Sequence, residues 1–153
     1  MNRKKKQLWI SRLADKAAKD HKYKSMYMEI AEVVSEMSYA KRLQVGCVIV
    51  KDDRIISMGW NGMPSGFDNQ CEDDNSETRP EVLHAESNAI AKLAKSNESG
   101  DGASLYCNYS PCMQCAKLAY QSGIKEFIYK HEYRNDEGIN FLKSAGVNIW
   151  KIP

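Results

Sequence analysis

The spacing of apolar positions in the first part of the chain predicts two helices followed by a β-hairpin. Residues 8–18 show loose helical spacing among charged residues, which predicts a marginal amphipathic helix. Residues 25–37 repeat apolar side chains every three or four positions, which predicts a second helix whose Met-rich face lies in the core. The apolar, β-branched run at 45–50 is separated from the run at 54–58 by Lys-Asp-Asp at 51–53. This order is typical of a hairpin.

The rest of the chain alternates helically spaced segments with short apolar runs. With the earlier elements, the order becomes helix, strand, strand, and then three helix–strand units. That order predicts an α/β fold with a mixed sheet and helices on its faces. Pro111 begins the middle one of these helices and Gly123 closes it. The helices are expected at 83–96, 111–121 and 135–144, and the strands at 103–106, 124–129 and 147–150.

Two segments after the hairpin fit neither spacing. Three glycines and a proline fall within residues 59–66, Gly-Trp-Asn-Gly-Met-Pro-Ser-Gly. This is either an ordinary surface loop or a place where backbone N–H groups approach a phosphate or sugar, with Asn61 offering a donor and an acceptor. Residues 68–80 are strongly polar, which predicts a long mobile insertion. Cys71 lies within it and could join a second metal, but no partner stands nearby at a suitable spacing.

Charge is divided unevenly along the chain. Residues 1–24 hold nine of the 22 Lys and Arg and two of the 20 Asp and Glu, which leaves 13 basic and 18 acidic residues for the remainder. A basic terminus can contact nucleic acid or an acidic surface, but a short Lys run is usually solvated. We therefore expect a solvated extension, and nucleic acid is not the expected partner.

The length of 153 residues suits one domain with a substantial core. The chain has no run of about 18 apolar residues, and the Lys run at 4–6 is not followed by the apolar segment of a secretory signal. These features predict no membrane association. Five cysteines, two of them at a metal-like spacing, fit a reducing compartment, so a soluble cytoplasmic protein is expected.

Two short motifs together predict a catalytic zinc site: His-Ala-Glu at 84–86 and Pro-Cys-Met-Gln-Cys at 111–115. Such a site takes three protein ligands and keeps a fourth position for water, and imidazole with two thiolates suits zinc. The expected ligands are His84, Cys112 and Cys115. Glu86 is close enough to reach the water without ligating, and it would carry the protons. The order H-x-E and then P-C-x-x-C matches the zinc deaminase pattern.

Each motif alone is compatible with other kinds of site. Cys-x-x-Cys also occurs in redox dithiols and structural zinc sites, and His-x-Glu occurs by chance. A closed structural site would need a further cysteine, which Cys47, Cys71 or Cys107 could supply. Glu86 argues against that site because a purely structural zinc does not require it.

At these positions the chain resembles the zinc-dependent cytidine deaminase superfamily and, within it, the deoxycytidylate (dCMP) deaminases. The zinc motifs are shared with tRNA adenosine, riboflavin-pathway and guanine deaminases, whereas the Asn-Gly-Met-Pro loop at 61–64 is more particular to dCMP deaminases. Trp60 stands where members of the family usually carry Tyr. The resemblance covers about residues 25–153 and rests on the segments 45–50, 59–66, 84–90, 111–117 and 121–126.

This resemblance implies a three-layer cytidine deaminase-like α/β fold, with a five-stranded mixed sheet and helices on both faces. It places a deaminase domain at 23–153 after a basic, helical extension at 1–22. The implied reaction is the zinc-dependent hydrolysis of dCMP to dUMP and ammonia, with Glu86 moving protons from water to ring N3 and to the leaving ammonia. Two alternatives remain, a tRNA or other nucleobase deaminase and a non-catalytic zinc module. The acidic insertion disfavours a polyanionic substrate.

The resemblance also implies a homohexamer that dCTP activates with Mg²⁺ and that dTTP inhibits. Basic side chains before the first strand suit a triphosphate. The residues expected to contact the substrate are Asn61, Ala85, Ser110, Tyr133 and Arg134. The residues expected to contact the effector are Lys41, Arg42, Gln44, Gly59, Asn61, Ser65 and Gly66.

Overall fold

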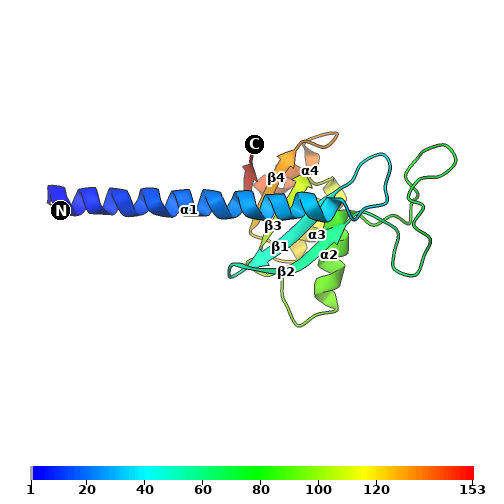
Figure 1. The fold of residues 1–153 in the computed structure, drawn as a ribbon, viewed down its shortest axis with the longest axis horizontal. Coiled ribbons are helices and arrows are strands. Elements are labelled where there is room, and N and C mark those ends of the chain that lie inside the picture. The colour runs from blue at the N-terminus through cyan, green and yellow to red at the C-terminus, as the bar shows by residue number, and fades with distance from the viewer. Residues whose placement is uncertain (1) are drawn as a thin grey trace.

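The computed structural model describes residues 2–153, and its elements follow the predicted order (Figure 1). The four helices and five strands of these residues form one α/β unit. The elements are α1 (Arg3–Ser35), β1 (Gly46–Lys51), β2 (Arg54–Trp60), α2 (Ala85–Ala94), β3 (Ser104–Tyr109), α3 (Met113–Gln121), β4 (Glu126–His131), α4 (Glu137–Ser144) and β5 (Asn148–Lys151).

The five strands form one mixed sheet in the order β2-β1-β3-β4-β5. β1 is antiparallel to both of its neighbours, whereas β3, β4 and β5 are mutually parallel. The β1–β2 hairpin turns at Asp52 and Asp53, which both have positive φ angles, 50° and 57°. Two such residues form the tight turn that fits the twist of a hairpin. The parallel strands are joined by helices, as crossover connections require.

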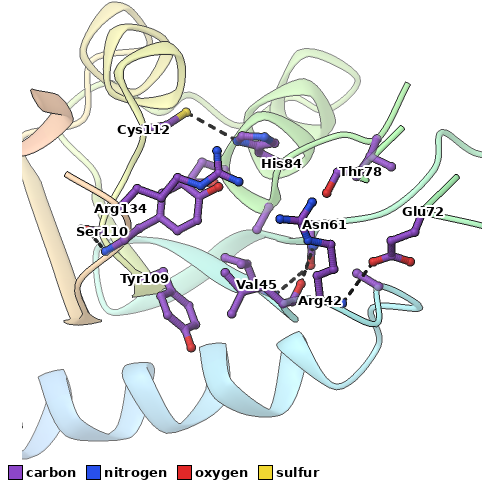
Figure 2. Close-up of a pocket in the computed structure, with 16 residues that line it drawn as sticks. Arg42, Val45, Asn61, Glu72, Thr78, His84, Tyr109, Ser110, Cys112 and Arg134 are labelled. Carbon is purple, nitrogen blue, oxygen red and sulfur yellow. Dashed lines mark hydrogen bonds between the residues drawn. The ribbon is translucent and has the colours of Figure 1, made fainter. Parts of the chain in front are cut away.

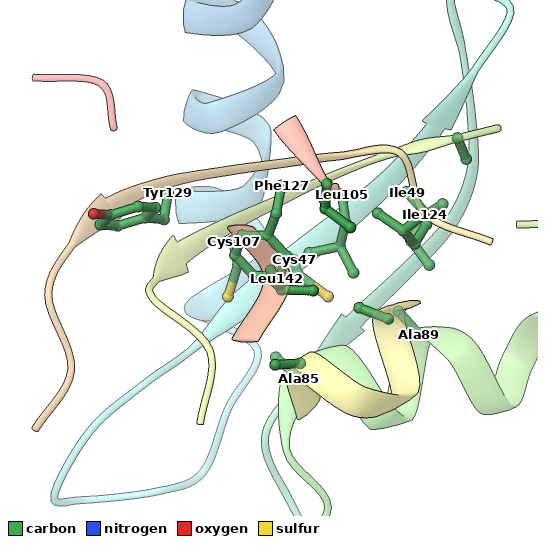
Figure 3. Packing of buried hydrophobic residues seen from close by; sticks show 14 of the residues in the cluster. Cys47, Ile49, Ala85, Ala89, Leu105, Cys107, Ile124, Phe127, Tyr129 and Leu142 are labelled. Carbon is green, nitrogen blue, oxygen red and sulfur yellow. The ribbon is translucent and has the colours of Figure 1, made fainter. Parts of the chain in front are cut away.

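Alternating side chains of each strand build a separate core on each face of the sheet. Val48 and Val50 of β1 pack against α1, whereas Cys47 and Ile49 face the other three helices. Figure 3 shows this second core, in which Cys47 and Ile49 of β1 lie on the side of the sheet that faces Ala85 and Ala89 of α2. The result is three layers with helices on both faces, which confirms the predicted fold class.

The predicted break between the two N-terminal helices is wrong, because α1 is one continuous helix. No glycine or proline lies between the two predicted segments, so nothing in the sequence stops the helix there. The helix begins at the N-cap Asn2, whose side chain accepts a hydrogen bond from the Lys5 N–H at 3.1 Å.

The predicted core face of this helix is only partly right. Of its apolar residues, Val34 is buried and Ile30 packs against the core, but Met26, Val33 and Met37 are exposed, with Val33 63 % accessible. The face that packs on the sheet also contains Tyr27, Met28 and Ala31. Because α1 carries apolar residues on both sides, spacing alone could not decide which side covers the sheet.

The polar segment 68–80 contains a small hairpin-like loop. An isolated bridge joins Glu72 to Thr78, and the Arg79 N–H donates to the Cys71 carbonyl at 2.9 Å. Cys71 and Glu72 are buried, so this segment is partly packed on the body rather than wholly solvated. Separately, none of the helices within residues 2–153 is both long and apolar enough to cross a membrane.

Candidate metal centre and substrate pocket

The two zinc motifs lie at the N-termini of two neighbouring helices. His84 is the N-cap of α2 and Cys112 is the N-cap of α3, and both have extended backbones. Neither side chain caps its own helix, so both are available to a ligand. Cys115 lies one turn into α3 on the same side as Cys112. Helix N-termini also stabilise thiolates, because free N–H groups and the helix dipole favour negative charge there.

The three expected ligands form one cluster whose spacing fits zinc. His84 Nδ1 lies 3.5 Å from Cys112 Sγ and 3.4 Å from Cys115 Sγ (Figure 2 draws the first contact). Metal bonds of about 2.0–2.3 Å in a tetrahedral arrangement require ligand atoms at about this separation. Among residues 2–153, no other His, Cys, Asp or Glu side chain joins the cluster. A catalytic zinc site has three protein ligands and leaves the fourth position to water or substrate, and this cluster offers three.

The thiols of this cluster are coupled to each other and to the imidazole. Hydrogen bonds from Cys115 and then His84 lower the pKa of Cys112 to about 3. The hydrogen bond between the two cysteines raises the pKa of Cys115, because the Cys115 thiol donates to the Cys112 thiolate. The Cys112 hydrogen bond also raises the pKa of His84. A thiolate is therefore already favoured before any metal binds, which is the form that zinc requires.

Glu86 is a buried carboxyl group beside the cluster. It lies in the first turn of α2 and is only 4 % exposed. Burial raises its pKa above the ordinary value, because the charged form loses its hydration. A carboxyl group whose pKa is raised in this way is better able to hold a proton and return it during a reaction.

A cavity of about 260 Å³ opens beside the cluster (Figure 2). Every residue that was predicted to contact the substrate lines it. His84 and Cys112 lie at one side of it, and Arg42 and Glu72 lie at the other. Its lining is contributed by segments from all parts of the domain. The lining residues are Ala40, Arg42, Leu43, Val45, Asn61, Glu72, Thr78, Val82, His84, Ala85, Glu86, Tyr109, Ser110, Cys112, Tyr133 and Arg134.

Ser110, Tyr133 and Arg134 form one group at the end of β3 and after β4. The Ser110 hydroxyl accepts a hydrogen bond from the Tyr133 N–H at 2.8 Å, which ties the two loops together. Arg134 has a φ of 31°, which is uncommon for a residue other than glycine, and its guanidinium lies 5.2 Å from the centre of the Tyr133 ring. Within residues 2–153, Arg134 has no ion-pair partner, so its charge is available to an anion.

The side chain of Asn61 is largely used by the protein itself. Its Oδ1 accepts from the Val45 N–H at 2.8 Å, and its Nδ2 donates to the Leu43 carbonyl at 2.8 Å. These bonds hold the segment before β1 against the loop after β2. One N–H and one lone pair of the amide remain for a ligand.

Comparison with known proteins identifies the family of this chain. Residues 16–131 match the model of the cytidine and deoxycytidylate deaminase zinc-binding region. The chain belongs to this family. The matched region includes His84, Glu86, Cys112 and Cys115.

Individual members of the family are similar over most of the chain. The deoxycytidylate deaminase of phage T4 is 31% identical over 172 residues, covering 84% of this chain and 89% of its own. That of Saccharomyces cerevisiae is 35% identical over 135 residues, covering 82% of this chain, but the match spans only 43% of the yeast protein. The dCMP deaminase of cyanophage S-TIM5, solved with dCMP and dUMP, has a TM-score of 0.83 and 48% identity, covering 84% of this chain and 96% of its own.

The residues expected to contact the effector occupy different places in this deaminase fold. Arg42 and Asn61 line the cavity beside the metal centre. The Arg42 guanidinium pairs with Glu77 at 2.8 Å, and the amide of Gln44 donates to the Ser38 carbonyl at 2.7 Å.

The glycine at the start of the predicted effector loop has a packing role. Gly59 lies in β2, where a Cβ would collide with the Ala85 carbonyl and the Ala89 N–H of α2. Because glycine has no side chain, β2 can pack closely against α2, the helix that begins at His84 and contains Glu86. Ser65 and Gly66 are exposed in the loop that follows β2.

Glu72 is a pocket residue that the sequence did not identify. Its buried carboxylate accepts hydrogen bonds from the backbone N–H groups of Lys41 and Arg42, at 2.8 Å and 3.1 Å. These bonds hold the polar insertion against the segment before β1. No local pattern could reveal them, because they join positions about 30 residues apart.

Proposed function

We propose that the chain is a zinc-dependent deaminase that hydrolyses dCMP to dUMP and ammonia. The observation that carries the proposal is the buried Glu86 beside a three-ligand cluster, in a cavity that also contains Arg134. Family membership and the likeness to a deaminase solved with dCMP and dUMP support the substrate. Because the chain spans less than half of the yeast relative, the proposal concerns the domain described here.

The proposed mechanism assigns the metal to three residues and the protons to one. His84, Cys112 and Cys115 would hold zinc, which lowers the pKa of water to about 7 in such sites. Glu86 accepts a proton from the attacking water and delivers it to N3 of the cytosine ring. It then takes the second proton of the same water and gives it to the amino group that leaves C4 as ammonia. Its raised pKa suits this role, because each cycle requires both forms of the carboxyl group.

We assign substrate positioning to other residues that line the same cavity. Ser110, Tyr133 and Arg134 supply hydroxyl groups and a cation for the 5′-phosphate. Asn61 has a donor and an acceptor left for the sugar. Ala85 lines the cavity at the start of α2, where it offers backbone groups and a small side chain to the base.

The variant Arg134→Gln should weaken use of dCMP much more than use of deoxycytidine. A charge-assisted hydrogen bond to phosphate contributes about 1.5–3 kcal/mol, which corresponds to a roughly 10–100-fold fall in kcat/KM for dCMP. Arg54→Gln is the matched control, since Arg54 pairs with Glu98 at the hairpin end of the sheet. An equal loss with both substrates would contradict phosphate recognition by Arg134.

The function is tested by incubating the purified chain with dCMP, CMP, dCTP and an anticodon stem-loop while measuring ammonia. We expect dCMP to be the preferred substrate. Activity only on the stem-loop, together with salt-sensitive RNA binding, would favour a tRNA deaminase. No ammonia from any substrate by a zinc-loaded chain would favour a non-catalytic zinc module.

We also infer nucleotide regulation and assembly from the family resemblance. The proposed enzyme is a cytoplasmic homohexamer that binds dCTP with Mg²⁺ as activator and dTTP as inhibitor. The proposed effector contacts are Lys41, Arg42, Gln44, Gly59, Asn61, Ser65 and Gly66. The bond network of Arg42 with Glu72 and Glu77 would link an effector to the substrate cavity, because Arg42 and Glu72 line that cavity.

Added dCTP with Mg²⁺ should raise turnover at low dCMP, and added dTTP should lower it. A coupling of 1–3 kcal/mol would change the apparent dCMP affinity by about 5–150-fold. The measurement is the initial rate against dCMP concentration with each effector, using dATP as the control nucleotide. Equal rates under all conditions would remove the regulatory proposal while leaving the catalytic one intact.

A further inference from the structure

One wall of the cavity beside the metal cluster is apolar. Leu43 and Val45 lie just before β1 and both line the cavity, whereas Gln44 between them does not. Val45 also packs against the core on the α2 side of the sheet, so the wall is anchored in the body of the protein. Figure 2 shows Val45 next to Asn61, the residue that we assign to the sugar. A ligand that reaches Asn61 therefore also reaches this wall.

The backbone groups of the wall that adjoin Asn61 are already paired within the protein. The Leu43 carbonyl accepts from Asn61 Nδ2 and the Val45 N–H donates to Asn61 Oδ1, each at 2.8 Å. The Val45 carbonyl accepts from the Asn61 N–H at 3.1 Å. The Gln44 carbonyl accepts from Asn108 Nδ2 at 3.2 Å. Since these polar groups have partners, the wall offers a ligand chiefly the apolar side chains of Leu43 and Val45.

The position of Asn61 decides which part of a nucleotide meets the wall. The N–H and the lone pair that remain on its amide suit a sugar hydroxyl, and the 3′-hydroxyl is the one that both dCMP and CMP carry. The 2′ carbon is bonded directly to the 3′ carbon, so it would lie against the side chains that adjoin Asn61. In dCMP this carbon bears only hydrogen, which suits an apolar surface, whereas in CMP it bears a hydroxyl group.

We propose that Leu43 and Val45 select 2′-deoxyribose over ribose. The inference deepens the proposed function and rests on it. A ribonucleotide would bury its 2′-hydroxyl against the wall without a hydrogen-bond partner, and such a group loses its hydration without compensation. An apolar pocket rejects an added hydroxyl by up to about 100-fold, so kcat/KM for dCMP should exceed that for CMP by about 10–100-fold.

A polar residue elsewhere in the cavity provides the alternative. Thr78 also lines the cavity, and its hydroxyl could pair with a 2′-hydroxyl. In that arrangement ribose would be accepted, and removal of the Thr78 hydroxyl would lower the use of CMP. The wall is favoured because Leu43 and Val45 are bonded directly to Asn61, whereas Thr78 is joined to Glu72 within the polar insertion.

The test compares kcat/KM for dCMP and CMP in the zinc-loaded full chain and in two wall variants. Val45→Thr keeps the shape of valine and places a hydroxyl where a methyl group stood. Leu43→Asn keeps roughly the length of leucine and supplies a donor and an acceptor. Each should lower the ratio of dCMP to CMP use about five- to tenfold, because the 2′-hydroxyl then gains a partner. The ratio is informative because a general weakening of the site would affect both substrates alike.

Val147→Thr is the matched control for the new hydroxyl. Val147 is buried in the core against which Val45 packs, and it is not among the residues that line the cavity. This variant should leave the ratio unchanged. Thr78→Val tests the alternative and should also leave the ratio unchanged. Circular dichroism and zinc analysis check that each variant is folded and loaded.

Three results would overturn the inference. The first is a parent chain that uses CMP as well as dCMP. The second is a parental ratio in both wall variants. The third is a fall in CMP use in Thr78→Val while the wall variants keep the parental ratio. All three leave the deaminase reaction in place, whereas a zinc-loaded chain that releases no ammonia from either nucleotide would refute the proposed function and this inference with it.

Discussion

Replacement of Glu86 by glutamine should abolish most turnover while leaving the metal centre intact. The amide has nearly the same shape as the carboxyl group, but it cannot take a proton from water and pass it to the ring. Loss of a general acid–base group costs about 10²–10⁴-fold in rate, and Glu86 is proposed to move both protons of the cycle, so a loss towards the upper end is expected. Because Glu86 is absent from the ligand cluster, zinc content should stay at about one ion per chain.

The measurement combines steady-state ammonia release from dCMP with elemental analysis of the same sample. Glu126→Gln is the control, because Glu126 is a partly buried carboxylate that accepts from Ser104 and Trp150 at the opposite end of the sheet. This control should keep near-parental turnover. Near-normal turnover in Glu86→Gln itself would contradict the assignment of Glu86 as the proton carrier.

The variant Cys112→Ala should release the metal. Cys112 is the cluster residue whose pKa is lowest, so its removal takes away the thiolate that the other two groups stabilise. Loss of an outer hydrogen-bond partner of a ligand costs roughly 10–100-fold in metal affinity, and loss of a direct ligand should cost more. Turnover should fall with zinc content, and the variant should resemble the parent chain after treatment with a chelator.

A second cysteine variant separates metal loss from a general effect of removing a buried thiol. Cys71 is buried in the polar insertion and lies outside the cluster. Cys71→Ala should therefore keep one zinc per chain and keep its activity. Full zinc content in Cys112→Ala would contradict the predicted ligand set, and loss of a second equivalent of zinc in Cys71→Ala would indicate another metal site at the insertion.

These two variants test different parts of the same centre. Glu86→Gln changes the reaction without changing the metal, whereas Cys112→Ala changes the metal first and the reaction as a consequence. If both variants lost zinc, the buried carboxylate would have a structural role beside the cluster. Comparison of zinc content with turnover therefore distinguishes proton transfer from metal binding.

The sequence predicted that His84, Cys112 and Cys115 form one cluster, because the spacing within each of the two motifs is local. Cys112 and Cys115 are one helical turn apart, and Glu86 follows His84 by two residues, so their relative positions follow from short-range geometry. The order of helices and strands was also predictable, because the periods of apolar residues differ between the two kinds of element. The hairpin turn at 51–53 follows from its composition in the same way.

Other features depended on where distant segments meet. The bonds of Asn61 to residues 43 and 45, and of Glu72 to residues 41 and 42, join segments that no periodic pattern connects. The buried side of α1 could not be predicted either, since apolar side chains lie on both of its sides.

The sequence by itself therefore determined the candidate metal ligands, the order of the elements and the mixed sheet. Only the tertiary structure decided that Glu72 of the polar insertion binds the backbone N–H groups of residues 41 and 42 and lines the same cavity as the metal cluster. It also decided that the N-terminal half of α1 projects beyond the body. The physical reason is that local spacing fixes which side chains share a face, whereas packing of whole elements fixes what that face meets.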